Sequence, residues 1–395
     1  MRGADVADVA VIGLGAVGSA VLYQLAWRGV RVVGIDRYHP PHAMGSSHGE
    51  TRISRLLVGE GDAYAPLVQR SHAIWQALEA ESGEQLFLRT GGLIMAPRDG
   101  AAEHHGTSDF VRRTAAVADR AGVPYDLLDA HAIAQRFPQF QLRGDELGVF
   151  EPSAGMVFPE RCVATQLRLA ERHGATLRLD DPVEGVRRIP GGVEVETRTG
   201  RVTAARAVLT AGPWLPQIAG HAIARVAKVY RQTLHWFTPE DRGAYAPDRF
   251  PVFIWMHGDG PEDYFYGFPT APGGRGVKVA SERYASPTDP DSVDRVVTKT
   301  ETAAIFARHV AGRLRGVTPD CLGTAACLYT VTPDAGFIVD ALPGEGRVLA
   351  VSACSGHGFK HSAALGEAVA EQVAGGASRI SLAPFALGRF AQAAI

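Results

Sequence analysis

A glycine-rich turn between a short apolar run and a helical pattern constrains this chain more than any other feature of its sequence. Residues 7–12 are apolar and rich in β-branched side chains, which predicts a strand buried on both faces. A helical pattern follows over 17–27, and a second buried strand is expected over 30–35. The turn between the first strand and the helix has the spacing GxGxxG, with glycines at Gly13, Gly15 and Gly18. Together these elements predict a βαβ unit that binds a dinucleotide.

The residue types in this unit suit a dinucleotide for physical reasons. Glycines let the backbone approach a pyrophosphate closely, and the helix N-terminus then faces that negative charge. Asp36 sits at the end of the second strand, where a carboxylate accepts hydrogen bonds from a ribose 2′-hydroxyl. A carboxylate there also repels a 2′-phosphate, which disfavours NADP. A glycine-rich turn without a ligand is the alternative.

Strand and helix patterns continue along the rest of the chain without an internal repeat or a long linker. The expected elements are a hairpin over 183–189 and 193–196, strands over 207–211, 263–268, 276–280 and 348–353, and helices over 300–314 and 362–373. Strands that return this late to a nucleotide-binding pattern predict one discontinuous domain with a second domain inserted into it.

Composition excludes several classes of partner. The 40 basic and 42 acidic residues leave a net charge of −2, so nothing calls for a nucleic acid or an anionic membrane. Four cysteines without a CxxC pair do not make a disulfide framework, which favours a reducing cytoplasm. The apolar stretch 6–26 carries three glycines and Asp8, so a buried strand and helix are favoured over a signal peptide or membrane span.

Two further motifs carry little weight. Residues 45–49 match the GxSxG of serine hydrolases, but Pro40 and Pro41 precede them in a loop, where a nucleophile elbow needs a strand. His104-His105 lacks the spacing to cysteines or carboxylates that a metal site needs, so no metal is expected.

Several segments distributed over nearly the whole length resemble the monomeric sarcosine oxidase and N-methyltryptophan oxidase family, within the larger group of FAD-dependent amine and D-amino-acid oxidases. The matching stretches are His39-Pro40-Pro41-His42, Gly45-Ser46 to Arg55, Gly59-Glu60-Gly61, Glu151-Pro152-Ser153-Ala154-Gly155, Tyr266-Gly267-Phe268-Pro269, Ala325 to Thr330 and Ser355-Gly356-His357-Gly358-Phe359-Lys360. The Cys-x-Tyr segment at Cys327 and the SGHGFK segment are the most specific.

The resemblance implies an α/β fold with a Rossmann-like FAD-binding domain and an inserted domain built on an antiparallel sheet. The expected FAD-binding segments are 5–85, 150–219 and 325–395, and the expected substrate segments are 86–149 and 220–324. The cofactor would be FAD, linked covalently through Cys327. Besides the glycines and Asp36 of the first unit, the expected cofactor-binding residues are Ser46, Arg52, Val183, Gly356, Gly358 and Lys360.

The family also implies roles for charged residues at the substrate site. Arg55 and Lys360 would bind the substrate carboxylate, the first as a planar fork and the second as a compact charge. Lys278 would lie against the flavin and speed its reaction with O2, with Arg52 near the same face. His48 would contact the flavin or order the loop, and Tyr329 would border the substrate.

Two positions depart from the pattern of the sarcosine oxidases. Glu282 stands where they have a histidine, and Phe265 stands where they have the first tyrosine of a Tyr-Tyr-Gly-Phe-Pro run. A carboxylate that faces the pocket would favour a substrate with an extra donor or positive charge, whereas a carboxylate that faces solvent would have no such effect. Sarcosine itself is therefore only one candidate, beside larger N-alkyl or cyclic amino acids.

The function that the resemblance implies is oxidation of a secondary amino acid. Hydride transfer to FAD is followed by reduction of O2 to H2O2, and the imine hydrolyses to an aldehyde and an amine. The alternatives are an oxidase of primary amino acids such as D-amino acids or glycine, a dehydrogenase of the same fold, and a non-catalytic flavin-binding module. A cytoplasmic monomer without a nucleic-acid or membrane partner is expected.

Overall fold

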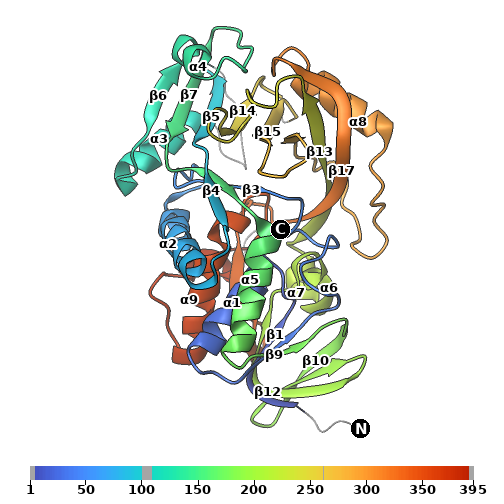
Figure 1. Ribbon diagram of the computed structural model, residues 1–395. Coiled ribbons are helices and arrows are strands. Elements are labelled where there is room, and N and C mark those ends of the chain that lie inside the picture. The colour runs from blue at the N-terminus through green and yellow to red at the C-terminus, as the bar shows by residue number, and fades with distance from the viewer. Residues whose placement is uncertain (1–4, 100–108, 261, 391–395) are drawn as a thin grey trace.

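Two large β-sheets dominate the computed structural model, which describes residues 5–99, 109–260 and 262–390. In Figure 1 one sheet fills the lower half of the molecule and the other the upper half, with a small three-stranded sheet between them. Because one chain passes between the halves several times, residues far apart in sequence meet where the halves join.

The lower sheet contains the predicted βαβ unit. Its strands β9, β2, β1, β12 and β19 lie side by side and parallel, and two antiparallel additions extend it, the β10–β11 hairpin beside β12 and β18 beside β19. The bounds are β1 (Asp5–Ile12), β2 (Val32–Ile35), β9 (Thr176–Arg178), β10 (Val183–Ile189), β11 (Gly192–Thr197), β12 (Gly200–Leu209), β18 (Ile338–Leu342) and β19 (Glu345–Ser352). Their apolar, β-branched composition suits strands that are covered on both faces.

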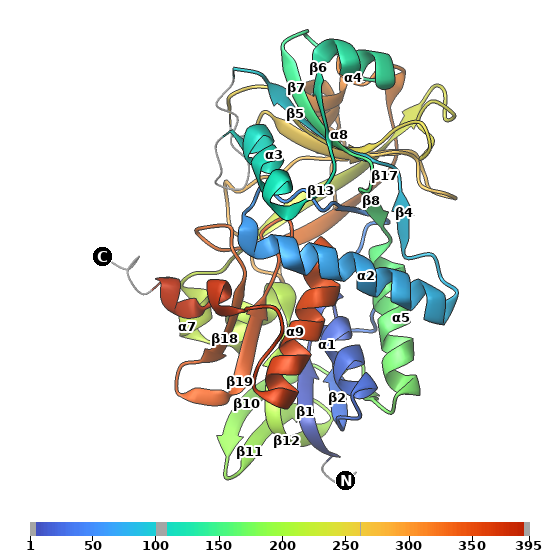
Figure 2. The same ribbon diagram turned by 90° about the vertical axis from the view of Figure 1, so that its left-hand side faces the viewer.

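Helices cover one face of this sheet. Figure 2 shows α1 beside α9, with α2 crossing above them and α5 alongside. Their apolar side chains form one core with Val9, Val11 and Val208 of the sheet. The small residues of α9 allow it to pack closely on α1. The bounds are α1 (Ala16–Trp27), α2 (Ala65–Ser82), α5 (Pro159–Arg172) and α9 (Ser362–Gly375), and the short helices α6 (Leu215–Ile218) and α7 (His221–Ala224) follow β12.

The upper sheet is antiparallel except where β14 runs parallel to β5. Its strand order is β17-β13-β16-β15-β14-β5-β7-β6. The bounds are β5 (Gly92–Pro97), β6 (Asp126–Asp129), β7 (Glu146–Glu151), β13 (Lys228–Pro239), β14 (Val252–Met256), β15 (Tyr264–Phe268), β16 (Val277–Ala280) and β17 (Val317–Val331), with helices α3 (Phe110–Ala121), α4 (Ala130–Arg136) and α8 (Lys299–Ile305). The small sheet pairs β3 (Arg52–Ser54) and β4 (Phe87–Arg89) with β8 (Gly155–Val157).

The mixed α/β architecture confirms the predicted fold class, and one predicted element is wrong in part. The helix expected over 300–314 ends as α8 at Ile305, and a π-helical turn, Phe306–Val310, follows it. This turn buries His309 beside His257, whose Nε2 lies 3.0 Å from the Nδ1 of His309. A tertiary contact therefore overrides the local helical pattern.

The division into two domains stays a prediction, and two of its boundaries, near 150 and 325, fall inside β7 and β17. Both strands run from the upper sheet toward the place where the halves join. Among the described residues, no helix is long and apolar enough to cross a membrane.

Candidate active site

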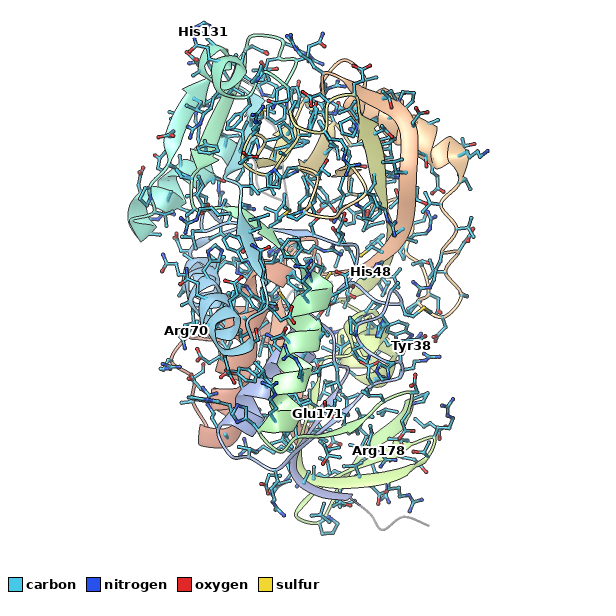
Figure 3. All side chains as sticks on the ribbon, in the orientation of Figure 1. Tyr38, His48, Arg70, His131, Glu171 and Arg178 are labelled. Carbon is cyan, nitrogen blue, oxygen red and sulfur yellow. The ribbon has the colours of Figure 1, made fainter. Side chains whose placement is uncertain are left out.

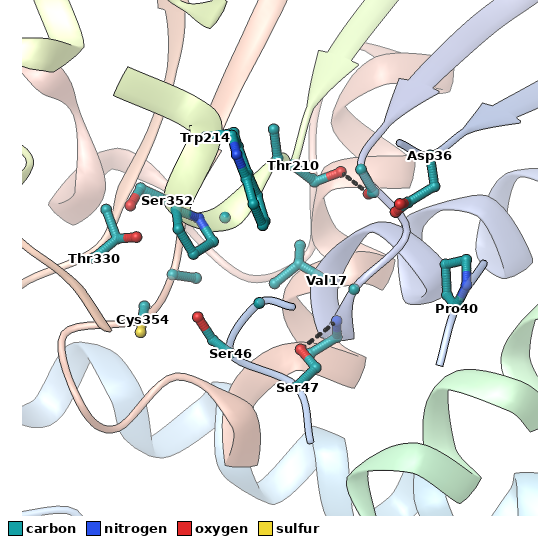
Figure 4. Close-up of a pocket in the computed structure, with 18 of the residues that line it drawn as sticks. Val17, Asp36, Pro40, Ser46, Ser47, Thr210, Trp214, Thr330, Ser352 and Cys354 are labelled. Atoms are coloured by element: carbon teal, nitrogen blue, oxygen red, sulfur yellow. Dashed lines mark hydrogen bonds between the residues drawn. The ribbon is translucent and has the colours of Figure 1, made fainter. Parts of the chain in front are cut away.

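A large cavity opens at the carboxyl ends of the parallel strands of the lower sheet, with a volume of about 330 Å³. Its walls come from the turn before α1, the end of β2, the loop before β3, and the segments after β12 and β19. Figure 4 shows Asp36, Ser46, Thr210, Trp214 and Cys354 around this hollow. Of the residues predicted to bind the cofactor, those on its wall are Gly13, Gly15, Asp36, Ser46, Arg52, Val183, Gly356 and Gly358.

Neither Gly13 in the turn before α1 nor Gly18 in the first turn of that helix has room for a side chain. A Cβ at Gly18 would lie 1.8 Å from the carbonyl oxygen of Gly13, so only glycine lets the helix pack against the turn. The Thr210 hydroxyl donates to the same oxygen at 2.6 Å, and Ser47 Oγ accepts the Ala16 N–H at 3.0 Å (Figure 4). The helix N-terminus thus borders the cavity with its positive end.

Asp36 is held firmly on the wall of the cavity. Its carboxylate accepts backbone N–H groups from Leu14 at 2.7 Å and from Tyr38 at 2.8 Å. Since a carboxylate has about four acceptor positions, these bonds are compatible with a further bond from a ribose hydroxyl. A cavity at the carboxyl ends of parallel strands, a glycine-rich turn at a helix N-terminus and a fixed carboxylate fit an adenine dinucleotide such as FAD.

Some cavity residues were not predicted from the sequence. Trp214 and Thr210 follow β12, and Cys354 follows β19. The Gly-Pro-Trp segment after the predicted strand over 207–211 could have indicated these residues, because residues at the carboxyl ends of parallel strands line ligand crevices.

A second, smaller cavity adjoins the first. Four residues line both cavities, namely Arg52, Tyr329, Gly356 and Phe359. The rest of its lining is Ile53, Arg55, Ile254, Tyr264, Tyr266, Phe268, Glu282, His357 and Lys360. The shared wall means that a ligand in the smaller cavity would lie next to one end of a ligand in the larger cavity.

Arg55 and Lys360 meet in the smaller cavity through a common carboxylate. Glu60 Oε1 lies 2.8 Å from Arg55 Nη2 and 2.9 Å from Lys360 Nζ. All three side chains are almost fully buried, with exposed fractions of 5% or less. Burial lowers the pKa of Lys360 to about 8, although Glu60 acts to raise it. The sequence placed the two cations together and missed Glu60 as their partner.

Backbone contacts fix both cations. The buried Glu151 carboxylate accepts N–H groups of Leu56 and Leu57 at 2.9–3.0 Å, which holds the loop after β3 that carries Arg55. Lys360 lies in a short turn, Phe359–His361, and its Nζ also donates to the His357 carbonyl at 3.0 Å. That turn needs glycine at 358, where a Cβ would lie 1.8 Å from the Ala353 carbonyl oxygen.

Glu282 lies on the wall of the smaller cavity and is only 7% exposed. It follows β16, and its Oε2 accepts the Tyr284 hydroxyl at 2.6 Å. Tyr264 and Tyr266 stand on the same wall, and the hydroxyl groups of Tyr266 and Tyr329 are 3.0 Å apart. The carboxylate that the sequence left as either solvent-facing or pocket-facing therefore faces the cavity.

Phe265 is a correction to the predicted site. Side chains alternate along β15, so Tyr264, Tyr266 and Phe268 face the cavity and Phe265 faces the opposite side of the sheet. There it packs with Trp255 and His309 in a separate apolar core.

Lys360 also differs from its expected double role in binding both cofactor and substrate, because it lines the smaller cavity and not the dinucleotide cavity.

Cys327 is fully buried on β17, close to the wall that the two cavities share. Arg52 Nη2 lies 3.5 Å from its sulfur and donates to the Ser46 carbonyl at 2.9 Å. The Ser46 hydroxyl in turn donates to the carbonyl of Leu328. Arg52, which lines both cavities, therefore connects the Cys327 sulfur to the wall that they share.

Lys278 and His48 lie behind this wall. The Nζ of Lys278 donates to the carbonyls of Gly49 at 2.7 Å and Thr51 at 2.6 Å, although burial lowers its pKa well below the ordinary value. Burial, and next to it the charge of Arg52, lowers the pKa of His48 to about 4, so this imidazole is neutral near pH 7. Neither side chain lines either cavity.

The described residues contain no cluster of His, Cys, Asp or Glu side chains that could hold a metal ion. Figure 3 shows His48 near the middle of the molecule and His131 at its upper end. His104 and His105 lie outside the described residues.

Comparisons with known proteins agree with this geometry. Residues 8–372 match the model of a family described as FAD dependent oxidoreductase. The monomeric sarcosine oxidase of Streptomyces avermitilis is 35% identical over 92% of this chain and 92% of its own length. The N-methyl-L-tryptophan oxidase of Salmonella arizonae is 34% identical over 98% of this chain and 99% of its own.

Solved structures with the same fold cover nearly the whole chain. NikD, described as an unusual amino acid oxidase essential for nikkomycin biosynthesis, superposes in its open form with a TM-score of 0.84 at 25% identity over 97% of both chains. An L-proline dehydrogenase from P. horikoshii has a TM-score of 0.79 at 20% identity over 99% of both chains, which shows the fold alone.

Proposed function

Since the chain belongs to the family of FAD-dependent oxidoreductases, we propose that it oxidises secondary amino acids whose carboxylate binds between Arg55 and Lys360. It is an FAD-dependent amine oxidase of the sarcosine oxidase type, as its full-length relatives indicate. N-methyl amino acids are the substrate class that these relatives support. The single observation that carries the proposal is the pair of buried cations in a cavity that adjoins the dinucleotide cavity.

The shared wall accounts for the orientation of the substrate. Its carboxylate would take a bidentate bond from Arg55 and a point charge from Lys360. The amine would then lie toward Arg52 and Tyr329, which line both cavities. A guanidinium at this wall disfavours an ammonium beside it, so Arg52 favours the neutral amine, whose nitrogen lone pair is needed to form an imine.

The larger cavity would hold FAD on the turn before α1, Asp36, Ser46 and Val183. When bound, FAD accepts a hydride from the carbon next to the amine and passes the electrons to O2, which gives H2O2. The protein contributes binding, orientation and charge. The Gly49 and Thr51 carbonyls that accept from Lys278 oppose the effect of burial and favour its ammonium form, which would supply a fixed positive charge for the reduction of O2. His48 would order the loop that carries Gly49 and Thr51.

The covalent link is a separate proposal and predicts a simple observation. Cys327 would carry the flavin as a thioether, because its thiol is buried beside the Arg52 guanidinium close to the dinucleotide cavity. We expect acid precipitation to give a yellow pellet, and Cys327→Ser to give a white pellet with yellow supernatant. Cys354→Ser is the matched control, since this thiol, unlike that of Cys327, lines the dinucleotide cavity itself. A colourless wild-type pellet would contradict the link.

Carboxylate binding should depend on pH through Lys360. The pKa of its buried ammonium is about 8 in the absence of substrate. A protonated Lys360 attracts a carboxylate and a neutral one does not, so affinity is highest below pH 8 and falls as the pH rises through it. We expect the Kd for propanoate, followed by flavin absorbance, to rise by up to about tenfold per pH unit above pH 8. Lys360→Met should bind more weakly and lose this dependence, and an unchanged slope in the variant would count against the assignment.

The experiment that tests the function is a peroxide-coupled screen of the flavin-loaded protein. N-methyl amino acids, cyclic imino acids, D-amino acids and glycine would be compared at equal concentration. Turnover of secondary amino acids supports the proposal, and turnover of primary amino acids alone would identify the primary amino-acid oxidase instead. Flavin reduction by secondary amino acids without peroxide would identify a dehydrogenase.

We infer further that the protein acts as a monomer in the cytoplasm. The monomeric state follows the description of the relative from Streptomyces avermitilis. All four cysteines lie in the described part of the chain and are free, which suits a reducing compartment. Gel filtration of the FAD-loaded protein with light scattering tests the first statement.

A further inference from the structure

A tight turn over residues 49–51 carries the carbonyl groups that hold the Lys278 ammonium. Gly49 and Glu50 have positive φ angles of 97° and 71°, and the Thr51 N–H donates back to the Gly49 carbonyl at 2.8 Å. Such angles are rare for a residue other than glycine and persist only where the surroundings fix them. Lys278 comes from β16 of the upper sheet, and its Nζ donates to the Gly49 and Thr51 carbonyls and, at 3.2 Å, to the Thr51 hydroxyl. The position of the ammonium therefore depends on the geometry of this turn.

Glu160 holds the other side of the same turn. This half-buried residue lies in the first turn of α5, where the helix dipole favours a carboxylate. Its Oε1 accepts the N–H groups of Gly49 at 2.6 Å and of Glu50 at 3.1 Å, and successive N–H groups in a turn form a concave site for an anion. The turn thus donates to a carboxylate and accepts from the Lys278 ammonium. Hydrogen bonds in such a series polarise and strengthen one another.

The charges around Lys278 agree with this geometry. The titratable groups that interact with its ammonium come from β3, the loop before it, α5 and β17, and they are Arg52, His48, Glu50, Glu160 and Cys327. Burial first and then the charge of Arg52 lower the pKa of Lys278, whereas the charges of Glu160 and Glu50 act to raise it. His48 is neutral near pH 7, because burial lowers its pKa to about 4. Glu160 therefore favours the ammonium form of Lys278 through its charge as well as through the turn.

We propose that Glu160 is a positioning residue for the reaction with O2, because its carboxylate fixes the turn that holds the Lys278 ammonium. The inference rests on the proposed function, in which O2 takes two electrons from the reduced flavin and two protons to become H2O2 near Lys278. Negative charge builds up on O2 before both protons arrive, so a cation that is fixed in advance speeds this step. Glu160 lines neither cavity, and it acts through the turn and Lys278.

Two variants separate the hydrogen bonds of Glu160 from its charge. Glu160→Ala removes both, and should slow the reaction of the reduced flavin with O2 by about 10- to 100-fold, because the cation is no longer held in place. Glu160→Gln keeps an oxygen that accepts both N–H groups, since both bonds go to Oε1, and should be slowed less. Glu171→Gln is the matched control, an exposed carboxylate at the lower end of α5 in Figure 3. Flavin reduction by substrate should match the wild type in all three. An unchanged reaction with O2 in Glu160→Ala would overturn the proposal.

The pH profile of the reaction with O2 tests the effect of the charge. Because the ammonium form of Lys278 speeds this step, its rate falls as the pH rises through the pKa of Lys278. Loss of a nearby negative charge lowers that pKa, so the fall should lie about one pH unit lower in Glu160→Gln than in the wild type. Coinciding profiles would show that Glu160 does not act on Lys278, and the proposal would fail.

A double variant distinguishes failure of this inference from failure of the proposed function. In Lys278→Met the further change Glu160→Gln should have no effect on the reaction with O2, because Glu160 acts through Lys278. A further loss in the double variant would overturn the proposal. Normal reaction with O2 in Lys278→Met alone would refute the proposed role of Lys278. Slow reaction in Lys278→Met beside normal reaction in Glu160→Ala would refute only the role of Glu160.

Hydrogen exchange gives a readout that does not depend on turnover. In the FAD-loaded protein, mass spectrometry of peptides that contain residues 49–51 would follow the amides of Gly49 and Glu50. We expect these amides to exchange faster in Glu160→Ala, where they lose their acceptor, and to stay close to the wild type in Glu160→Gln. Equal exchange in Glu160→Ala and the wild type would show that the carboxylate does not hold the turn, which would overturn the proposal.

Discussion

Replacing Lys278 by methionine should slow the reaction of the reduced flavin with O2 by about 100- to 1000-fold. The substitution keeps the length of the side chain and removes the charge. Reduction of O2 builds up negative charge, which a fixed cation in a water-poor site stabilises strongly. Lys278 is 1% exposed and is held by the carbonyls of Gly49 and Thr51, so its position is set before O2 arrives.

The measurement separates the two half-reactions. Enzyme reduced without oxygen would be mixed with buffer containing O2, and the return of flavin absorbance would be followed by stopped flow. Reduction by substrate should change only a few-fold, because Lys278 does not line the substrate cavity. Lys228→Met is the matched control, an exposed lysine on the neighbouring strand β13. Equal slowing of both half-reactions, or loss of bound FAD, would show that Lys278 has a structural role only.

The first βαβ unit shows how much of this fold is encoded locally. Its strand and helix were predicted over 7–12 and 17–27 and are found as Asp5–Ile12 and Ala16–Trp27. The prediction succeeds because the apolar pattern, the glycine spacing and the buried strand all lie in contiguous residues. The helix expected over 300–314 fails in its second half for the opposite reason, since the burial of His309 depends on His257, about 50 residues earlier.

The site shows the same contrast between features that contiguous residues encode and features that depend on distant contacts. The motifs predicted a shared role for Arg55 and Lys360, and both residues line one cavity. Glu60, however, joins these two cations across about 300 residues of sequence, and no local pattern reports such a pairing. The error at Phe265 was avoidable, because strand alternation already places residues 264, 266 and 268 on one face. The orientation of Glu282 needed the fold itself, because it depends on how the upper sheet faces the lower one.

Replacing Arg55 by glutamine should lower kcat/KM by about 100- to 1000-fold, the usual effect of removing one member of a buried charge pair. The guanidinium donates to Glu60 and to the Leu57 carbonyl, and it is one of two guanidinium groups, with that of Arg52, that line this cavity. Arg55→Lys should lose less, because it keeps the charge but not the bidentate geometry. The exposed Arg136→Gln is the control, and a loss no larger than in that variant would remove Arg55 from the substrate site.

Replacing Glu60 by glutamine should have the opposite effect and strengthen the binding of a carboxylate ligand. The Glu60 carboxylate already bonds to Arg55 and Lys360, so a substrate carboxylate must share or displace those bonds. Removing the charge leaves both cations for the ligand, and we expect the Kd for propanoate at pH 6 to fall by about tenfold. The pH is chosen because losing Glu60 also lowers the pKa of Lys360 further below about 8, which would mask the gain in alkaline solution. Tighter binding in Glu60→Gln, together with weaker binding in Arg55→Gln, requires that ligand and Glu60 compete for the same cations. Weaker binding in both variants would mean instead that Glu60 only holds Arg55 and Lys360 in place.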